Sequence, residues 1–84
     1  MKYKIIIVDD HKLFNEGIKR ILTTDFDVVA QIYDGREAIH AVQKYNPHLV
    51  LLDINLPNRK GLEIGQELKK AFSEVKIAFL SMYS

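Results

Sequence analysis

Two short apolar runs that end abruptly in carboxylates constrain the fold of this chain more than any other feature. Residues 5–8 are followed at once by Asp9 and Asp10, and residues 48–52 are followed by Asp53. Apolar runs without polar alternation are typical of strands that are covered on both faces of a parallel sheet. Because ligands bind at the carboxyl edge of such a sheet, we expect the three acids to share one crevice there.

Between these runs, hydrophobic residues recur at spacings of three and four, which predicts amphipathic helices. The helix over residues 12–24 is expected to bury one apolar face, made of Leu13, Phe14, Ile18, Ile21 and Leu22. A second helix follows Asp34, whose spacing to Glu37 resembles a capping box, and it ends at Asn46-Pro47. A third helix covers residues 61–72. Gly17 and Gly65 lie within helices and are interpreted as close-packing positions, because no phosphate-binding glycine pattern occurs.

Residues 27–33 and 75–81 provide two further strands, so strand and helix alternate along the chain. Residues 27–33 are less uniformly apolar because of Gln31, which favours a position nearer the sheet edge. Strand-helix-strand units connect through right-handed crossovers, which gives a parallel sheet with helices on both faces. The predicted class is therefore α/β, doubly wound, in three layers.

Composition narrows the functional classes. The 84 residues suit one small domain, and a formal net charge of +1 gives no field that favours nucleic acid or acidic lipid. Cysteine is absent, which excludes a disulfide framework, a thiol nucleophile and a zinc-thiolate site. The first apolar run is too short for a signal-peptide core or a membrane span. We expect a soluble, cytoplasmic protein.

Three clustered carboxylates repel one another, and each of them prefers the protonated form. Such a cluster persists best around a hard cation with oxygen ligands, for which Mg²⁺ is the natural candidate. One of the three acids could then also act as a nucleophile.

Three motifs, in this order and after successive strands, resemble the receiver domain of two-component response regulators: Val8-Asp9-Asp10-His11, Asp53-Ile54-Asn55-Leu56-Pro57 with Gly61, and Leu80-Ser81. The segments 9–14 and 80–82 lean toward the LuxR-like branch, whose members usually end in a helix-turn-helix domain. The resemblance implies a flavodoxin-like fold with strand order 2-1-3-4. It also implies that residues 1–84 are a single partial receiver, in which the fifth strand with its lysine and the last two helices are missing.

The resemblance also implies roles for individual residues. Asp53 would accept a phosphoryl group from a histidine kinase, and the Ser81 hydroxyl would contact that group once it is present. Asp10 would ligate Mg²⁺ directly, Asp9 through water, and Asn55 through its backbone carbonyl. A receiver of this kind is a signalling domain, which at most catalyses its own phosphorylation and dephosphorylation.

Two alternatives stay open. One is a non-signalling receiver fragment that acts as a self-associating binding module, and the other is an aspartyl-phosphate phosphatase of the haloacid dehalogenase type. Asp53-Ile54-Asn55 lacks the second acid that the phosphatase motif requires. If the chain is a receiver, signalling or not, the unpaired edge of the fourth strand predicts a homodimer or larger assembly, with no direct binding of nucleic acid or membrane. His11 is interpreted as an exposed loop histidine, and Met82 and Tyr83 as the exit from the fourth strand.

Overall fold

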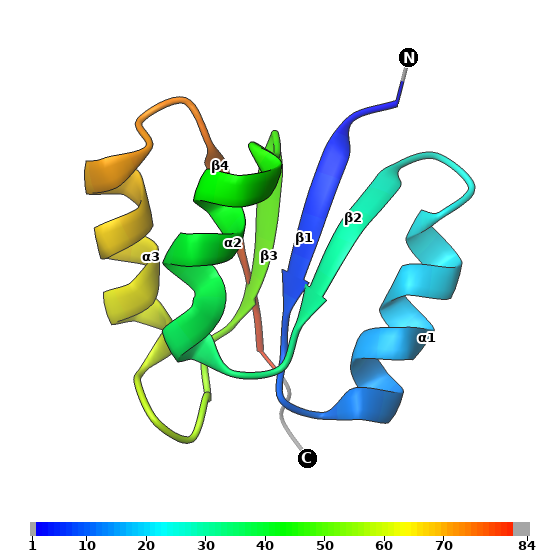
Figure 1. Ribbon diagram of the computed structural model, residues 1–84. Helices are drawn as coiled ribbons and strands as arrows, with labels where there is room; N and C mark the ends of the chain where they lie inside the picture. The colour runs from blue at the N-terminus through cyan, green and yellow to red at the C-terminus, as the bar shows by residue number, and fades with distance from the viewer. Residues whose placement is uncertain (1, 82–84) are drawn as a thin grey trace.

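A computed structural model describes residues 2–81, which form one four-stranded parallel sheet with helices on both faces (Figure 1). The elements in chain order are β1 (Lys4–Val8), α1 (Lys12–Leu22), β2 (Asp27–Ile32), the 3₁₀ turn η1 (Gly35–Glu37), α2 (Ala38–Tyr45), β3 (Leu49–Asp53), α3 (Gly61–Ala71) and β4 (Lys76–Leu80). Neighbouring strands follow the order β2-β1-β3-β4, and all pairs are parallel. The predicted fold class and strand order are confirmed. Met82 and Tyr83 lie outside the described residues.

The main core lies between the sheet and the helices α2 and α3, which cover the same face (Figure 1). Its fully buried side chains come from β1, β3, α2 and α3 and include Ile6, Val8, Val42, Val50, Leu52, Ile64 and Leu68. Burying each of these side chains stabilises the fold by about 1.5–3 kcal/mol before entropy is counted. The core holds β1 and β3 in register, with Val8 beside Leu52. This register places Asp9 next to Asp53 at the carboxyl edge.

The predicted apolar face of α1 is partly wrong. Leu13 and Ile21 are 91% and 76% exposed, whereas Phe14, Ile18 and Leu22 are half-buried. The only buried residue of α1 is Asn15. The stripe that faces β1 and β2 runs through positions 14, 15, 18 and 22, so side chains at 13 and 21 point away from the sheet. Among the described residues, no second helix lies beside α1 to cover them.

The ends of the helices follow the turn residues in the sequence. Asn46 has φ 48° and ψ 59°, and its N–H donates to the Val42 carbonyl, which closes α2 as predicted. At the start of η1, Asp34 accepts from the N–H of Arg36 and is paired with its guanidinium, which lowers the pKa of Asp34 to about 2. The capping box is only half present, because Glu37 makes no side-chain capping bond.

The two helical glycines differ in their surroundings. A Cβ at Gly65 would meet the Phe79 ring at 2.7 Å, which confirms the packing interpretation of Gly65. Gly17 has nothing within 4 Å, so the packing interpretation of Gly17 is wrong.

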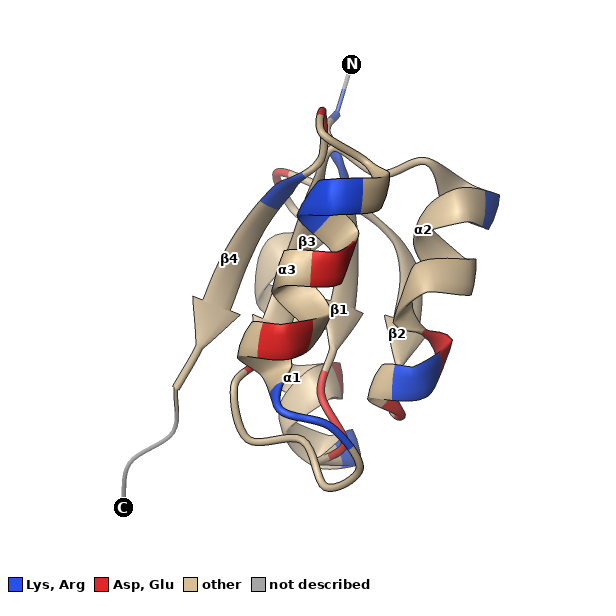
Figure 2. Ribbon diagram, turned by 90° about the vertical axis from the view of Figure 1, so that its left-hand side faces the viewer, with Lys and Arg blue, Asp and Glu red and all other residues tan. Residues whose placement is uncertain are grey.

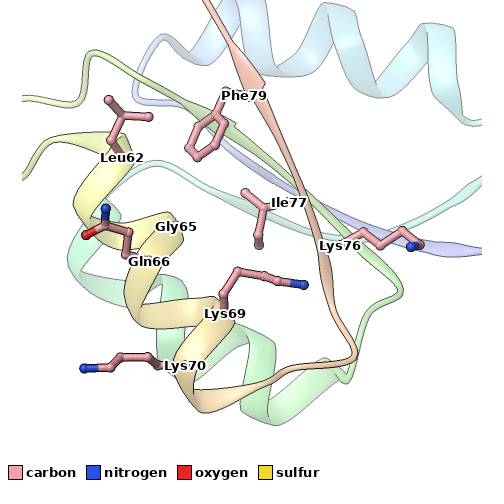
Figure 3. Close-up of a pocket in the computed structure, with 8 residues that line it drawn as sticks. All are labelled: Leu62, Gly65, Gln66, Lys69, Lys70, Lys76, Ile77 and Phe79. Carbon is pink, nitrogen blue, oxygen red and sulfur yellow. The ribbon is translucent and has the colours of Figure 1, made fainter.

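Figure 3 shows Ile77 and Phe79 of β4 facing α3 across an open groove, which Lys69, Lys70 and Lys76 also line. Within residues 2–81, β4 pairs only with β3. Self-association through this edge stays a prediction. Among the described helices, none combines the length and apolar character needed to cross a membrane.

Candidate metal and phosphoacceptor site

The ends of β1 and β3 bring four titratable side chains together at the carboxyl edge of the sheet. Asp9, Asp10, His11 and Asp53 each offer one ligand atom, and these atoms lie within 4.8 Å of one another. Asp9 is completely buried, Asp53 is 3% exposed, and Asp10 is half-buried. Figure 2 shows acidic segments at this lower end of the sheet. The sequence predicted that the three acids meet, and the parallel register of β1 and β3 brings them together.

Backbone hydrogen bonds hold the two buried carboxylates in place. Oδ1 of Asp9 accepts from the N–H of His11 at 2.8 Å, and Oδ1 of Asp53 accepts from the N–H of Asn55 at 3.0 Å. Both bonds reach two residues forward, a pattern that Asp favours where a strand ends in a turn. Each carboxylate is therefore oriented by its own chain segment, with its second oxygen left free of that bond.

Asn15 supports the end of β1 from the first turns of α1. Its Nδ2 donates to the carbonyls of Asp9, at 3.1 Å, and Ile32, at 3.4 Å, while its Oδ1 accepts from Gln31 at 3.0 Å. The sequence analysis missed this residue. The available signal was its position between Phe14 and Ile18 on the sheet-facing stripe, where a buried amide requires polar partners.

Two carboxylate oxygens of the cluster lack partners. Oδ2 of Asp9 and Oδ1 of Asp10 are shielded from solvent and accept no hydrogen bond from any residue in the described part of the chain. A buried carboxylate oxygen without a donor is costly, and a divalent cation is the group that satisfies several at once. The donor set consists mainly of hard oxygens, as Mg²⁺ prefers. The residues present therefore fit a Mg²⁺ ion.

The electrostatics of the cluster act most clearly on Asp53. Burial raises the pKa of Asp53, and the negative charges of Asp9 and Asp10 raise it further. The Asn55 N–H bond and the nearby His11 oppose this shift. At neutral pH, without a cation, the ionised Asp53 therefore destabilises the folded state.

This shift predicts a pH-dependent stability. With the folded pKa above the ordinary value of 3.8, the folded state keeps a proton that the unfolded chain has lost. The contribution of Asp53 to the free energy of unfolding therefore falls as pH rises through the interval above 3.8. We expect Asp53→Asn to remove this dependence and to stabilise the protein at pH 7 by about 0.5–2 kcal/mol. Urea unfolding in a chelating buffer measures both effects, and a variant no more stable than the wild type would contradict them.

The remaining predicted site residues lie at the same edge. Asn55 is exposed and directly follows Asp53 and Ile54. Ser81 is exposed and follows β4, whose Leu80 carbonyl accepts from the N–H of Ile54 at 3.0 Å. Ser81 therefore adjoins the segment that carries Asp53. The roles that the resemblance gives to these side chains remain predictions.

Comparisons with known proteins agree on one family. The sequence model of the response regulator receiver domain matches residues 5–84. The chain is 45% identical over 84 residues to the transcriptional regulatory protein DegU of Brevibacillus brevis, covering 98% of this chain and 36% of DegU. It is 37% identical over 83 residues to the oxygen regulatory protein NreC of Staphylococcus aureus, covering 95% of this chain and 38% of NreC. The chain thus spans about two fifths of the length of these curated relatives.

Solved structures give the same result. A two-component response regulator of the LuxR family from Aurantimonas superposes with a TM-score of 0.92 at 27% identity, covering 100% of this chain and 61% of that one. The response regulator TrrA of Thermotoga maritima, solved in complex with Mg²⁺-BeF, superposes with a TM-score of 0.90 at 34% identity, covering 100% of this chain and 72% of TrrA.

Proposed function

Because the chain belongs to the response regulator receiver domain family, with LuxR-family regulators among its relatives, we propose that Asp53 accepts a phosphoryl group from a histidine kinase. The observation that carries the proposal is the buried carboxylate of Asp53 at the end of β3, beside two acids with unpartnered oxygens. A cation-binding cluster around one oriented carboxylate is what phosphoryl transfer requires, since that reaction depends on positioning and charge stabilisation.

The geometry of Asp53 suits nucleophilic attack. Oδ1 is engaged by the N–H of Asn55, which leaves Oδ2 to attack the phosphorus atom of the donor. As the new O–P bond forms, the bond between phosphorus and the donor breaks, and the leaving group keeps its electron pair. The product is an acyl phosphate on Asp53. A bound Mg²⁺ would supply positive charge that neutralises the carboxylates and the phosphoryl oxygens.

The same proposal assigns the supporting groups. Asp9, Asp10, Asp53 and the backbone carbonyl of Asn55 would hold the ion, and the Ser81 hydroxyl would donate to a phosphoryl oxygen. Support for the acids comes from their shared edge and their unpartnered oxygens. Support for Ser81 comes from the bond between Leu80 and Ile54, which joins β4 to the segment after Asp53.

The receiver family match favours phosphoacceptor signalling over the non-signalling fragment and over the haloacid dehalogenase type of phosphatase. We place the action of the domain in the cytoplasm, with a histidine kinase as its partner. TrrA, one of the related receivers, was solved with Mg²⁺-BeF, which suggests a suitable probe for this chain.

Acetyl phosphate tests the proposal without the unknown kinase. The chain is incubated with acetyl phosphate and Mg²⁺, and intact mass spectrometry should show the addition of one phosphoryl group. Hydroxylamine should remove the adduct, because it cleaves acyl phosphates, and a chelator should prevent its formation. A folded chain that gains no such adduct in the presence of Mg²⁺ would overturn the proposal.

A further inference from the structure

His11 contacts the acidic cluster although most of its side chain is exposed. Its ring is 60% exposed, as expected for a loop histidine, yet Nδ1 lies 3.2 Å from Oδ1 of Asp9 and 3.4 Å from Oδ1 of Asp10. The backbone of His11 is fixed on both sides, because its N–H donates to Asp9 and its carbonyl accepts from the N–H of Asn15. One ring nitrogen therefore faces the cluster from a defined position.

The distances from Nδ1 of His11 to the Asp9 and Asp10 oxygens suit atoms that bind the same metal ion. Adjacent ligand atoms of an octahedral ion, bound at about 2.1 Å, lie about 3 Å apart. The separations of Nδ1 from both carboxylate oxygens are close to this value. One of these oxygens, Oδ1 of Asp10, and the second oxygen of Asp9, Oδ2, are buried without a hydrogen-bond partner among the described residues. This second observation points to a ligand that the site is built to receive.

The neighbouring cation does not occupy this position. The ammonium of Lys12 lies over the ring of Tyr33, 5.8 Å from its centroid. His11 is therefore the nitrogen donor that the chain presents to Asp9 and Asp10 within the group of potential ligands.

We propose that His11 is a metal ligand through Nδ1 and that it sets the ion preference of this site. Three carboxylates alone favour Mg²⁺, whereas an added imidazole favours divalent ions of the first transition series, Mn²⁺ least and the later ions most. The site then binds Mn²⁺, Co²⁺ or Zn²⁺ more tightly than three carboxylates would, while Mg²⁺ gains little from the imidazole. This inference rests on the acidic site of the proposed function and adds to it the residue that determines specificity.

Mn²⁺ is the probe that tests this directly. Pulsed electron paramagnetic resonance of the Mn²⁺-loaded chain should show coupling to a directly bound ¹⁴N nucleus, a readout independent of phosphorylation. His11→Ala should abolish the coupling and weaken Mn²⁺ and Zn²⁺ binding in calorimetry on the order of tenfold. Mg²⁺ binding should change about twofold at most. His40→Ala is the matched control, since His40 is exposed on α2 and should leave every signal unchanged.

The possible outcomes separate the two proposals. Mn²⁺ bound without nitrogen coupling, or bound more tightly by His11→Ala, would overturn the role of His11 and leave the proposed phosphoacceptor intact. The second result would mean that His11 only pairs with the acids and competes with the ion. A folded chain that binds neither Mg²⁺ nor Mn²⁺ would overturn both proposals. The wild-type spectrum alone decides the point if His11→Ala does not fold.

Discussion

Replacing Asp53 with asparagine is expected to abolish phosphoryl incorporation from acetyl phosphate, a loss on the order of a hundredfold or more. An amide is a poor nucleophile, and the acyl phosphate cannot form on it. The substitution is nearly isosteric, and the amide oxygen can still accept the N–H bond of Asn55. A lost adduct would therefore reflect the missing nucleophile and not unfolding, because the variant is expected to be more stable than the wild type at neutral pH. Intact mass spectrometry measures the adduct, and circular dichroism monitors the fold.

Asp27→Asn is the matched control for this experiment. Asp27 is an exposed carboxylate at the start of β2, where its backbone lies opposite Lys4 of β1 in the strand register. This end of the sheet is the one away from the acidic cluster. Its replacement should leave the adduct unchanged. An adduct that persists in Asp53→Asn would place the acceptor elsewhere, and peptide mapping would then identify the modified acid.

Gly61→Ala is expected to destabilise the fold by about 3 kcal/mol or more, the upper end of what overpacking costs. Gly61 begins α3, where a Cβ would lie 2.1 Å from the carbonyl oxygen of Asp53 and 2.8 Å from Cα of Ile54. Both neighbours are backbone atoms, so a side-chain rotation cannot relieve the overlap. A domain of this length has about 4–13 kcal/mol of stability in total, so the substitution should remove roughly a quarter to three quarters of it. Urea unfolding monitored by circular dichroism measures the change.

Gly17→Ala provides the contrast. Gly17 lies in α1 with nothing within 4 Å of an added Cβ, so this substitution should stabilise the helix by about 0.5–1 kcal/mol. If Gly61→Ala proved as benign as Gly17→Ala, α3 could shift away from β3 without cost, and the close approach would have no structural importance.

Much of the site was predictable because it depends on regular structure. Parallel strands end at the same edge, so Asp9, Asp10 and Asp53 had to meet once residues 5–8 and 48–52 were recognised as neighbouring strands. The resemblance supplied the strand order, which the alternation of strands and helices leaves undetermined. The first prediction rests on apolar runs several residues long, and the second rests on the family resemblance.

The contacts that were missed each depend on a single side chain. Apolar spacing placed Leu13 and Ile21 inside, but the buried position of α1 belongs to Asn15, whose amide satisfies carbonyls at the ends of two strands. That requirement exists only in the folded molecule. The overlap that excludes a side chain at Gly61 likewise arises where α3 meets the end of β3, whereas the His11 ring contacts are local, made with the two residues before it.

A backbone hydrogen bond joins the two ends of the loop between Asp53 and α3. The N–H of Gly61 donates to the carbonyl of Ile54 at 2.9 Å, and buried Leu56 fixes the first half of the segment. Beyond Leu56, residues 57, 58 and 60 are exposed, and Arg59 is paired with Glu67 of α3. The length and composition of residues 57–60 can therefore diverge between homologues, for instance to suit different upstream donors, without displacing the carboxylate at the base of the loop.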